Sequence, residues 1–493
     1  MKLKKLLKGI KVLNARQVKN VTIDNISNKT TDILTNGLYV CLKGENVDGH
    51  NLKQEAQRCG AVAFVVEEYD YDFSGLQILV EDTRAVLSKL ARNFYGEIPK
   101  VIGITGTNGK TTTTNIVYHI LKESGKKVGL IGTEGIFYND QKITLHMTTP
   151  DPLELYKYLA DMKNSACEYA VMEVSAHAIF YKKVNAINFC IKALTNITED
   201  HLDFFKTLSN YQKTKMGFMV KDKCIKIVNT DDKYGVSLAC KNKNCFTYST
   251  NLPADARAEN ITCGGKRFNL ILNGKNLSVE SNLLGEYNVQ NMLCGALICS
   301  RLGITNSQII SAIKTFTPVD GRLNEYKIGN KNIVIDFAHT PDALKNVLVT
   351  LRKITQNKLY CLFGCGGNRE TEKRSIMGQI AGEFSDFVYV TSDNPRFEEP
   401  DFIANQITSG IKSKNYKVIL DRKTAIYDAI NTMQDGDILA ICGKGAENYL
   451  EIKGVKYPYS DKEVVEQCGG KKVGKTMNGE EWRLMTDEMK IDE

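Results

Sequence analysis

The sequence lacks any apolar run of about 18 residues, the length that a membrane-spanning helix requires. Its first residues, "MKLKKLLKGIKVL", include lysines but no uninterrupted apolar segment and no small-residue cleavage site, unlike a secretory signal. There are also no internal repeats and no low-complexity segments. These absences argue against a membrane-spanning or secreted protein, and we expect a cytoplasmic protein with no membrane partner.

The fourteen cysteines form no tight spacing framework, which suits a reducing compartment. Cys240 and Cys245 have no second pair at zinc-ribbon spacing, so we expect incidental thiols there. The net charge of +8 comes from 65 basic and 57 acidic residues spread along the chain, without a cluster of aromatic and basic residues or a helicase motif. We therefore expect no nucleic-acid partner, because attraction of an anionic substrate explains the mild charge equally well.

The stretch "VIGITGTNGKTTTTNIVYHILKESGKKVGLIG" has the pattern of a phosphate-binding loop. An apolar strand (101–104) precedes a glycine-rich turn ending in Gly-Lys-Thr, and an amphipathic run to Gly125 precedes a second strand (128–131). Ile104 stands where the first glycine of the usual spacing would fall, and an ordinary glycine turn is the alternative. We predict a nucleotide-phosphate site made of Gly106, Thr107, Asn108, Gly109, Lys110, Thr111 and Thr112, with Lys110 on the β/γ-phosphates and Thr111 on Mg²⁺.

With 493 residues the chain is too long for one core. Alternating apolar strands and helical patterns after Pro99 predict a mostly parallel sheet with helices on both faces. We expect an α/β protein with a small α/β N-terminal domain, a central P-loop ATPase domain and a Rossmann-like C-terminal domain. The expected boundaries are 1–97, 98–318 and 319–468, followed by a tail of unknown role, 469–493, which holds the only tryptophan, Trp482.

Four strands predicted in the third block are each followed by a polar or glycine-rich cluster: "DFAHTPDAL", "GCGGNRE", "TSDNPRFEEP" and "GKGAENY". Ligands of open α/β sheets bind outside the carboxyl ends of the strands. We therefore predict one site made of all four clusters, which hold Arg369, Asp393, Arg396 and Glu447. The alternative is that these are ordinary polar loops.

Three residues of the middle block are candidates for metal or catalytic roles. Glu173 ends an apolar strand (169–172), His201 follows another strand together with Asp203, and Lys215 lies in a helical segment. The alternatives are a helix cap or surface carboxylate, a structural histidine and a surface lysine.

The motifs "TGTNGKTTT", "TTPDP" (148–152), "MEVSAHA" (172–178), "TNITEDHLDFF" (195–205), "GEYNVQN" (285–291), "DFAHTPDAL", "GCGGNRE", "TSDNPR" and "GKGAENY" occur in this order between about residues 25 and 465. Together they resemble the Mur ligases of peptidoglycan synthesis. "HTPDAL" and "DNPR" are similar to the MurE type, which adds the third amino acid to UDP-MurNAc-L-Ala-D-Glu. The resemblance implies that ATP, bound with Mg²⁺, converts the glutamyl γ-carboxylate into an acyl phosphate that the incoming amine attacks.

The resemblance also implies roles for individual residues. Thr111 and Glu173 would hold one Mg²⁺, His201 would help to bind a second, and Lys215 matches the lysine that the family carbamylates into a metal ligand. Positions around the nucleotide match Asn288, Asn291, Arg322, Asp336 and His339. Positions that contact the UDP-sugar peptide match Ser27, Thr148, Thr149, Ser175, Tyr181 and Lys183.

The chain departs from the family pattern at four places. Tyr181 and Lys183 stand where the family often has Gln and Arg, Asn28 follows Ser27 where Arg is usual, and Ala446 replaces a usual histidine. Lys183 still supplies charge for a pyrophosphate, so we expect altered contacts rather than lost function.

The resemblance implies meso-diaminopimelate as the amine substrate, because enzymes that use it carry the motif found here as Asp393, Asn394, Pro395 and Arg396. Arg396 can bind the additional carboxylate bidentately, while Glu447 and the Gly443 carbonyl would bind the ammonium, and Arg369 adds positive potential. The alternatives are internal pairing of Arg396 with Asp393 or Glu398, use of L-lysine, a folylpolyglutamate-type ligase, and a binding subunit without catalysis. We expect a monomer.

Overall fold

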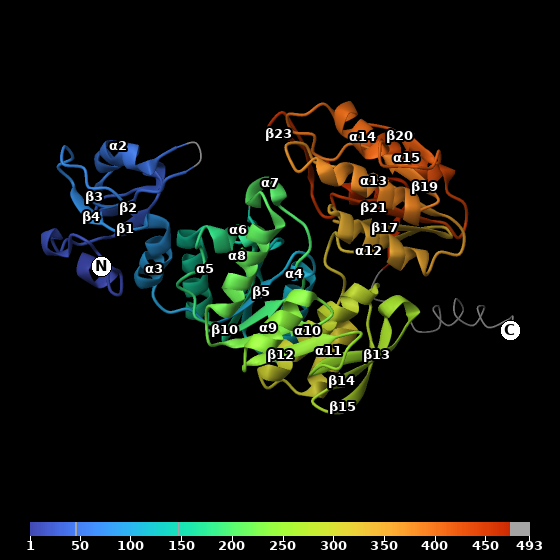
Figure 1. Cartoon of the computed structure of the whole chain (residues 1–493), viewed down its shortest axis with the longest axis horizontal. Coiled ribbons are helices and arrows are strands. Elements are labelled where there is room, and N and C mark those ends of the chain that lie inside the picture. The colour runs from blue at the N-terminus through green and yellow to red at the C-terminus, as the bar shows by residue number, and fades with distance from the viewer. Residues whose placement is uncertain (45–46, 146, 474–493) are drawn as a thin grey trace.

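The computed structural model describes residues 1–44, 47–145 and 147–473, and the expectation for most of the tail, including Trp482, lies outside these residues. Three α/β units follow one another along the chain (Figure 1). Their sheets use residues 25–79, 100–280 and 324–472. This architecture confirms the predicted α/β class, while the exact domain boundaries stay predictions.

The N-terminal unit has a four-stranded parallel sheet in the order β1-β2-β3-β4. The side chain of Asp82 caps helix α3 by accepting a hydrogen bond from the Ala85 amide, and Gly96 ends this helix at a φ of 93°. Helix α3 packs against α5 of the middle unit, so it joins the two units. The elements are α1 (Leu3–Leu6), β1 (Asn25–Ser27), β2 (Gly37–Val40), α2 (Lys53–Arg58), β3 (Ala61–Val66), β4 (Leu76–Leu79) and α3 (Thr83–Tyr95), with 3-10 turns at Ala15–Gln17, Thr30–Asp32 and Gly49–Leu52.

The middle unit has an eleven-stranded sheet in the order β15-β14-β13-β12-β11-β10-β5-β9-β6-β7-β8. The strands from β13 to β6 are parallel, as predicted, and buried apolar side chains form a core on each face. The elements are β5 (Lys100–Thr105), α4 (Lys110–Glu123), β6 (Val128–Gly132), β7 (Gly135–Tyr138), β8 (Gln141–Ile143), α5 (Pro152–Asn164), β9 (Tyr169–Glu173), α6 (Ala176–Phe180), β10 (Phe189–Leu194), α7 (Leu202–Phe205), α8 (Leu208–Val220), β11 (Ile225–Asn229), α9 (Lys233–Lys241), β12 (Cys245–Ser249), β13 (Ala256–Thr262), β14 (Arg267–Leu272), β15 (Lys275–Glu280), α10 (Glu286–Arg301) and α11 (Asn306–Thr315), with a 3-10 turn at Cys263–Gly265.

The C-terminal unit has a seven-stranded sheet in the order β20-β19-β18-β21-β17-β16-β24, whose first five strands are parallel. Helices α12 to α14 contribute to one core and α15 and α16 to the other. The elements are β16 (Asn324–Ile328), β17 (Lys331–Asp336), α12 (Pro341–Arg352), β18 (Leu359–Phe363), α13 (Glu372–Phe384), β19 (Phe387–Val390), α14 (Pro400–Thr408), β20 (Tyr416–Val418), α15 (Arg422–Thr432), β21 (Ile438–Cys442), β22 (Tyr449–Ile452), β23 (Val455–Pro458), α16 (Asp461–Gln467) and β24 (Lys471–Lys472).

Strand register aligns the ends of neighbouring strands. In the middle sheet Thr105 pairs with Leu194 and Ile104 with Glu173, so the segments after β5, β9 and β10 emerge side by side. In the C-terminal sheet Asp336 pairs with Cys442, and Phe363 pairs with Val390. Each sheet therefore presents its following loops along one edge.

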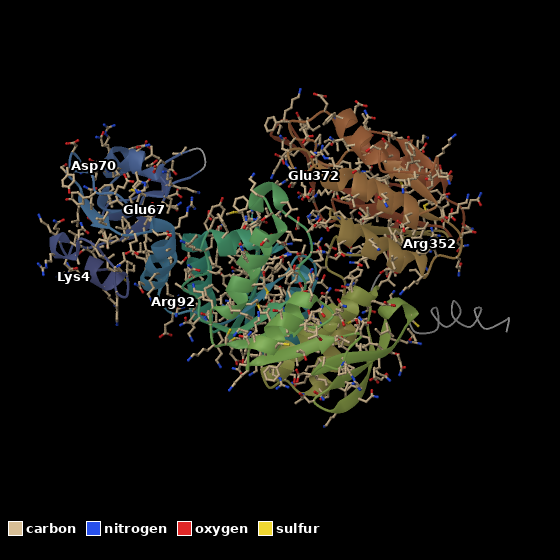
Figure 2. All side chains as sticks on the ribbon, in the orientation of Figure 1. Lys4, Glu67, Asp70, Arg92, Arg352 and Glu372 are labelled. Atoms are coloured by element: carbon tan, nitrogen blue, oxygen red, sulfur yellow. The ribbon has the colours of Figure 1, made fainter. Side chains whose placement is uncertain are left out.

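Charged side chains cover the surfaces of all three units, as the spread of charge along the sequence indicated (Figure 2). Among the described residues, the structure has no helix that is both long and apolar enough to cross a membrane.

A buried ion pair holds the carboxyl ends of two site-bearing strands. Arg422, the first residue of α15, makes two bonds of 2.8 Å to the Asp461 carboxylate, and both side chains are almost fully buried. The same guanidinium donates to the carbonyls of Cys442 at the end of β21 and Ser392 just after β19. Arg422 therefore ties α15 and α16 to these strand ends.

Asp461→Asn removes one charge of this pair and leaves the Arg422 guanidinium buried without it. Because losing one partner of a buried pair costs about 3–5 kcal/mol, we expect faster amide hydrogen exchange in α15, α16 and β21, with unchanged exchange in the other two units. Mass spectrometry of peptic fragments measures this. The control is Glu81→Gln, which removes an exposed pair with Lys11 worth at most about 1 kcal/mol. Wild-type protection of α15 in D461N would contradict the anchoring role.

Candidate active site

The glycine-rich loop between β5 and α4 passes very close to two neighbouring elements. Gly106 has a φ of 151°, and a Cβ there would lie 1.8 Å from the Thr195 hydroxyl oxygen. Gly109 has a φ of 84°, and its Cβ would lie 2.4 Å from Oδ1 of Asn291 on α10. Glycine is therefore required at both positions, by backbone conformation and by space.

Some backbone amides of the loop are already hydrogen-bonded within the protein, and those of the first turn of α4 remain available. The amides of Thr107 and Asn108 donate to the backbone and side chain of Asn196, each at 2.9 Å. The first turn of α4, which contains Lys110, Thr111 and Thr112, is left as the helix N-terminus that can bind a phosphate.

Two lysines, Lys110 and the buried Lys215, donate to one loop carbonyl. Lys110 Nζ donates to the carbonyl of Gly106 at 2.9 Å and to that of Thr107 at 2.8 Å. Lys215 Nζ, from α8, donates to the same Gly106 carbonyl at 2.8 Å and lies 4.8 Å from the centre of the Tyr211 ring. Burial, followed by the charge of Lys110, lowers the pKa of Lys215 well below its usual value. Burial therefore favours the neutral amine form of Lys215 over the charged form.

Glu173, at the end of β9, faces the first turn of α4. Its carboxylate accepts hydrogen bonds from the Thr111 hydroxyl at 3.0 Å and from the Thr133 amide at 2.8 Å. The Thr149 hydroxyl donates to the Glu173 carbonyl at 2.9 Å, and the Ser175 amide donates to the Thr149 hydroxyl oxygen at 3.1 Å. A hydroxyl and a carboxylate oxygen thus lie together beside the loop, which is the donor chemistry that Mg²⁺ prefers.

His201 lies in left-handed backbone conformation, with a φ of 56°. Its Nε2 is 3.3 Å from Oδ2 of Asp200, and its ring centre lies 4.8 Å from that of His177. Burial lowers the pKa of His201 to about 4, so the ring is neutral at physiological pH. Within the described residues no group of three or more His, Cys, Asp and Glu side chains gathers around one point. A Mg²⁺ ion here would therefore draw further ligands from phosphates and water, as is usual for this ion.

The residues expected around the nucleotide come from both sides of the junction between the middle and C-terminal units. On α10, the Asn291 side chain donates to Oδ1 of Asn288 at 2.9 Å. On the C-terminal side, the Arg322 guanidinium stacks over the Phe337 ring at 4.5 Å, and a ring nitrogen of His339 lies 3.0 Å from the Phe337 carbonyl.

Asp336 and Asn108 also lie at the contact between the middle and C-terminal units. The Asp336 carboxylate accepts from the amides of Leu323 and Ala338, each at 2.8 Å, and burial raises its pKa. The Asn108 side chain donates to Asp342 of α12 at 2.9 Å, which links the loop directly to the C-terminal unit.

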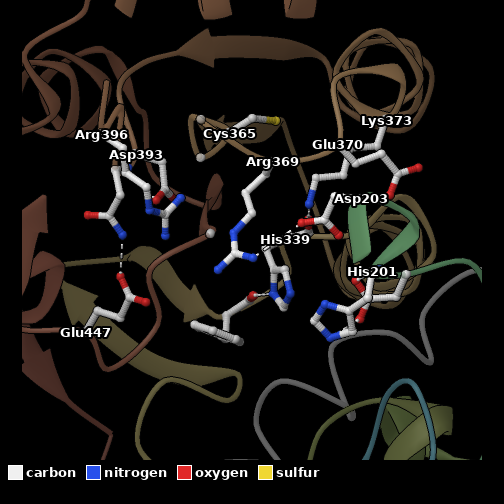
Figure 3. A pocket seen from close by; sticks show the side chains of 16 residues that line it. His201, Asp203, His339, Cys365, Arg369, Glu370, Lys373, Asp393, Arg396 and Glu447 are labelled. Atoms are coloured by element: carbon white, nitrogen blue, oxygen red, sulfur yellow. Dashed lines mark hydrogen bonds and ion pairs between the residues drawn. The ribbon is translucent and has the colours of Figure 1, made fainter. Parts of the chain in front are cut away.

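The four clusters at the ends of the C-terminal strands meet in one pocket, here called the strand-end pocket (Figure 3). It encloses about 170 Å³, and residues 200, 201 and 203 of the middle unit close its other side. Arg369 points into it and makes an ion pair of 3.4 Å with Asp203 across the two units. The lining residues are Asp200, His201, Asp203, Phe337, His339, Gly364, Cys365, Gly366, Arg369, Glu370, Lys373, Asp393, Asn394, Arg396, Gly443 and Glu447.

The Arg396 side chain bonds to two residues that were not predicted from the sequence. Its Nε lies 3.1 Å from Oε2 of Glu451 on β22, and Nη1 donates to the Gly367 carbonyl at 2.8 Å. Glu398, one of the two partners considered, pairs instead with Arg374, at 2.8 Å. Internal pairing of Arg396 therefore occurs, but with a different carboxylate. Its φ of 52° marks an uncommon backbone conformation of the kind that clusters at functional sites.

Glu447 faces Arg396 across the same pocket (Figure 3). One of its carboxylate oxygens accepts from the Asn394 side chain at 2.9 Å and from Lys444 at 3.1 Å. Gly443 has a φ of 110°. Pro395 is not among the lining residues, and its carbonyl accepts from the Glu398 amide.

A second cavity, here called the junction pocket, lies between the N-terminal and middle units and encloses about 440 Å³. Tyr181 and Lys183 line it, together with Arg84 of α3, whose guanidinium stacks over the Tyr181 ring at 4.9 Å. Lys183 pairs with Asp151 at 2.8 Å. The Ser27 hydroxyl bonds to the backbone of residue 29, and neither it nor Thr148, Thr149 and Ser175 lines this pocket.

Four residues near these sites were not predicted from the sequence: Asp200, Thr133, Arg84 and Glu451. Asp200 immediately precedes His201 in "TEDHLDFF" and Thr133 follows a predicted strand, so strand-end position could have indicated both. No sequence signal pointed to Arg84 or Glu451, because each reaches its site only through packing between distant segments.

A glycine-rich loop between a parallel strand and the N-terminus of a helix that can bind phosphate defines a P-loop nucleotide-binding protein. Family models extend this classification. The Mur ligase middle domain matches residues 104–299, the glutamate ligase domain of Mur ligases matches 321–445, and the model described as Mur ligase family, catalytic domain, matches 22–95. The chain belongs to the Mur ligase family.

Curated relatives are similar over nearly their whole length. The UDP-N-acetylmuramoyl-L-alanyl-D-glutamate--2,6-diaminopimelate ligase 1 of Clostridium acetobutylicum is 39% identical, covering 95% of this chain and 99% of its own. The corresponding ligase of Aquifex aeolicus is 38% identical, covering 92% and 94%. A solved structure of a 2,6-diaminopimelate ligase of this name superposes with a TM-score of 0.68 at 28% identity, covering 95% and 98%. The ADP complex of MurF from Thermotoga maritima, at 21% identity and a TM-score of 0.63 over 85% and 93%, shares the fold.

Gly106→Ala places a Cβ against Thr195 and forces an L-residue into a conformation that favours glycine. Because such backbone strain costs about 1–3 kcal/mol, we expect ATP to bind about tenfold more weakly or worse, measured by calorimetry. The matched control is Gly217→Ala on α8, where a Cβ meets nothing within 4 Å. Unchanged ATP affinity in G106A would show that the loop does not hold the phosphates.

Proposed function

We propose that this protein is an ATP-dependent amide ligase that joins meso-2,6-diaminopimelate to the γ-carboxylate of D-Glu in UDP-MurNAc-L-Ala-D-Glu. The observation that carries this proposal is the strand-end pocket. Arg369, Arg396 and Glu447 of the C-terminal unit line it together with Asp200 and His201 of the middle unit, which contains the phosphate loop. An amino acid bound there lies beside the domain that binds ATP. Relatives named for this reaction match almost the full chain.

The reaction needs ATP because a carboxylate oxygen is a poor leaving group. An oxygen of the γ-carboxylate attacks the γ-phosphorus, the bond to ADP breaks, and an acyl phosphate forms. The amine nitrogen then attacks the acyl carbon, phosphate leaves, and the nitrogen loses a proton to solvent. The chain contributes mainly by positioning the reactants and neutralising charge.

The phosphate groups bind at the first turn of α4, next to Lys110. The nucleotide extends toward α10 and the C-terminal unit, where Asn288, Asn291, Arg322, Asp336 and His339 surround it. The link between Asn108 and Asp342 keeps the loop and the C-terminal unit together around this nucleotide.

The residues beside the loop fit Mg²⁺ in donor chemistry. Thr111 and Glu173 would hold one ion, and His201, neutral and next to Asp200, would contribute to a second. When bound, Mg²⁺ supplies positive charge against the triphosphate. The chain's own part is to keep the Thr111 hydroxyl and the Glu173 carboxylate together.

The environment of Lys215 favours carbamylation of its side chain. Carbamylation requires a neutral amine, whose nitrogen bonds to the carbon of CO₂ and releases a proton. Burial and the nearby positive charge of Lys110 both favour that neutral form, because they lower the pKa of Lys215. The resulting carbamate is an anion, so it would turn an unfavourable contact between two lysines into an attractive one and would serve as a further ligand for Mg²⁺.

The UDP-sugar peptide extends from the junction pocket to the loop. Tyr181 and Lys183 line its nucleotide end, where Lys183 supplies charge for the diphosphate, and Ser27 lies in the same N-terminal unit. The reacting end of the peptide binds close to Glu173. The residues near it are Thr148, Thr149 and Ser175.

Diaminopimelate differs from lysine by a second carboxylate. Arg396 binds this carboxylate with its planar fork, and Glu451 and the Gly367 carbonyl fix the orientation of that fork. Glu447 and the Gly443 carbonyl accept from the ammonium, while Asp393, Asn394 and Pro395 shape the loop. L-Lysine would leave Arg396 without this contact.

The direct test is phosphate release by the purified protein with ATP, Mg²⁺ and UDP-MurNAc-L-Ala-D-Glu, comparing meso-diaminopimelate with L-lysine. We expect turnover with diaminopimelate only. Turnover with lysine would retain the ligase and overturn the role of Arg396. No amine-dependent turnover with either would overturn the proposed function.

Arg396→Lys keeps the charge but loses the planar fork. Since a charge-assisted hydrogen bond is worth about 1.5–3 kcal/mol, we expect KM for diaminopimelate to rise about tenfold or more, with KM for ATP unchanged. Steady-state kinetics measure both. The control is Arg352→Lys on α12, where the arginine makes an exposed ion pair with Asp386. An unchanged KM for diaminopimelate in R396K would place the second carboxylate elsewhere.

A further inference from the structure

A continuous row of aromatic rings connects the junction pocket to the strand-end pocket. The ring of Tyr181, which lines the junction pocket, lies 5.6 Å from that of Phe204. Phe204 lies 4.5 Å from His177, and His177 lies 4.8 Å from His201, which lines the strand-end pocket. These residues belong to α6, α7 and their flanking positions, and Figure 1 shows these helices on the part of the middle unit between the other two units.

Phe180 packs against this row and is itself exposed. The residue is 52% exposed, although its ring contacts those of Tyr181 at 5.2 Å, Phe204 at 5.0 Å and Phe205 at 5.9 Å. All three contacts are within a few degrees of perpendicular, the edge-to-face geometry that aromatic pairs prefer. An isolated exposed phenylalanine needs no explanation, but one packed against a row of rings between two pockets does.

Charge marks one end of the row. The Arg84 guanidinium lies over the Tyr181 ring at 4.9 Å and donates to the Lys43 carbonyl, and Lys183 lines the same pocket. Positive side chains at this end suit the diphosphate of a nucleotide sugar. The group that follows the diphosphate along such a molecule is the sugar ring, and the aromatic row begins at this pocket, at Tyr181.

We propose that Phe180, with Tyr181, Phe204 and His177, forms a platform on which the hexopyranose ring of the nucleotide-sugar substrate stacks. This inference rests on the proposed function and deepens it. The apolar C–H face of a pyranose can cover the Phe180 ring while its hydroxyl groups stay in water, which removes apolar surface from solvent on both partners. Phe180 thereby positions the sugar, so that the attached peptide reaches the phosphate loop.

The test is Phe180→Ala, compared with Phe180→Tyr, which keeps the ring. We expect KM for UDP-MurNAc-L-Ala-D-Glu to rise about tenfold in F180A and to stay near wild type in F180Y, with kcat and the KM values for ATP and diaminopimelate unchanged. The Kd of UDP alone, measured by calorimetry, should be the same in all three proteins, because UDP has no sugar beyond its ribose. Phe402→Ala, at another exposed phenylalanine on α14, is the control.

Two results would overturn the platform. One is a wild-type KM for the sugar substrate in F180A, and the other is an equal weakening of UDP, which would place the nucleotide itself on the ring. A change of oligomeric state in F180A, seen by sedimentation, would also overturn it and identify the patch as a contact between two copies. A wild-type protein without amine-dependent turnover overturns the proposed function itself, whereas turnover with an unaltered KM in F180A overturns the platform alone.

Discussion

Two lysine side chains donate to the same carbonyl oxygen, that of Gly106, and the Lys215 side chain is almost fully buried. Holding two ammonium groups so close together is costly, because they repel each other and the buried one loses its hydration. The arrangement would become favourable with negative charge beside it, such as the proposed phosphate next to Lys110 or the proposed carbamate on Lys215. The segments around the loop, from α8 to the end of β9, hold the two lysines in this arrangement.

The proposed chemistry also depends on contact between units that are distant in sequence. Asn108 bonds to Asp342, and Arg369 pairs with Asp203, so the phosphate loop and the strand-end pocket are joined at two points. On the other side, Ser88 of α3 donates to the carbonyls of residues 182 and 183. These contacts join the middle unit to the unit on each side of it, so the junction pocket and the strand-end pocket are both built from two units.

Much of the fold was accessible from local patterns, because an apolar run followed at once by glycine or polar residues marks the carboxyl end of a buried parallel strand. The four strands predicted before the polar clusters are present as β17, β18, β19 and β21. The antiparallel hairpins β7–β8 and β13–β15 were not anticipated, since exposed edge strands carry weak apolar patterns. The partner of Arg396 was also missed, because Glu451 lies on β22, a short strand that packing alone brings to the site.

The phosphate loop, the parallel α/β class, the family and the four strand-end clusters could be inferred from the amino-acid sequence, since each depends on residues that are close together in the chain or in a fixed order. Three features became visible only in the folded chain: Lys215 shares a carbonyl with Lys110, Asp200 accompanies His201 in the strand-end pocket, and Phe180 remains exposed against a row of rings. Burial and charge interactions depend on distances in space, and these distances are set by how separate segments pack and not by their spacing along the chain.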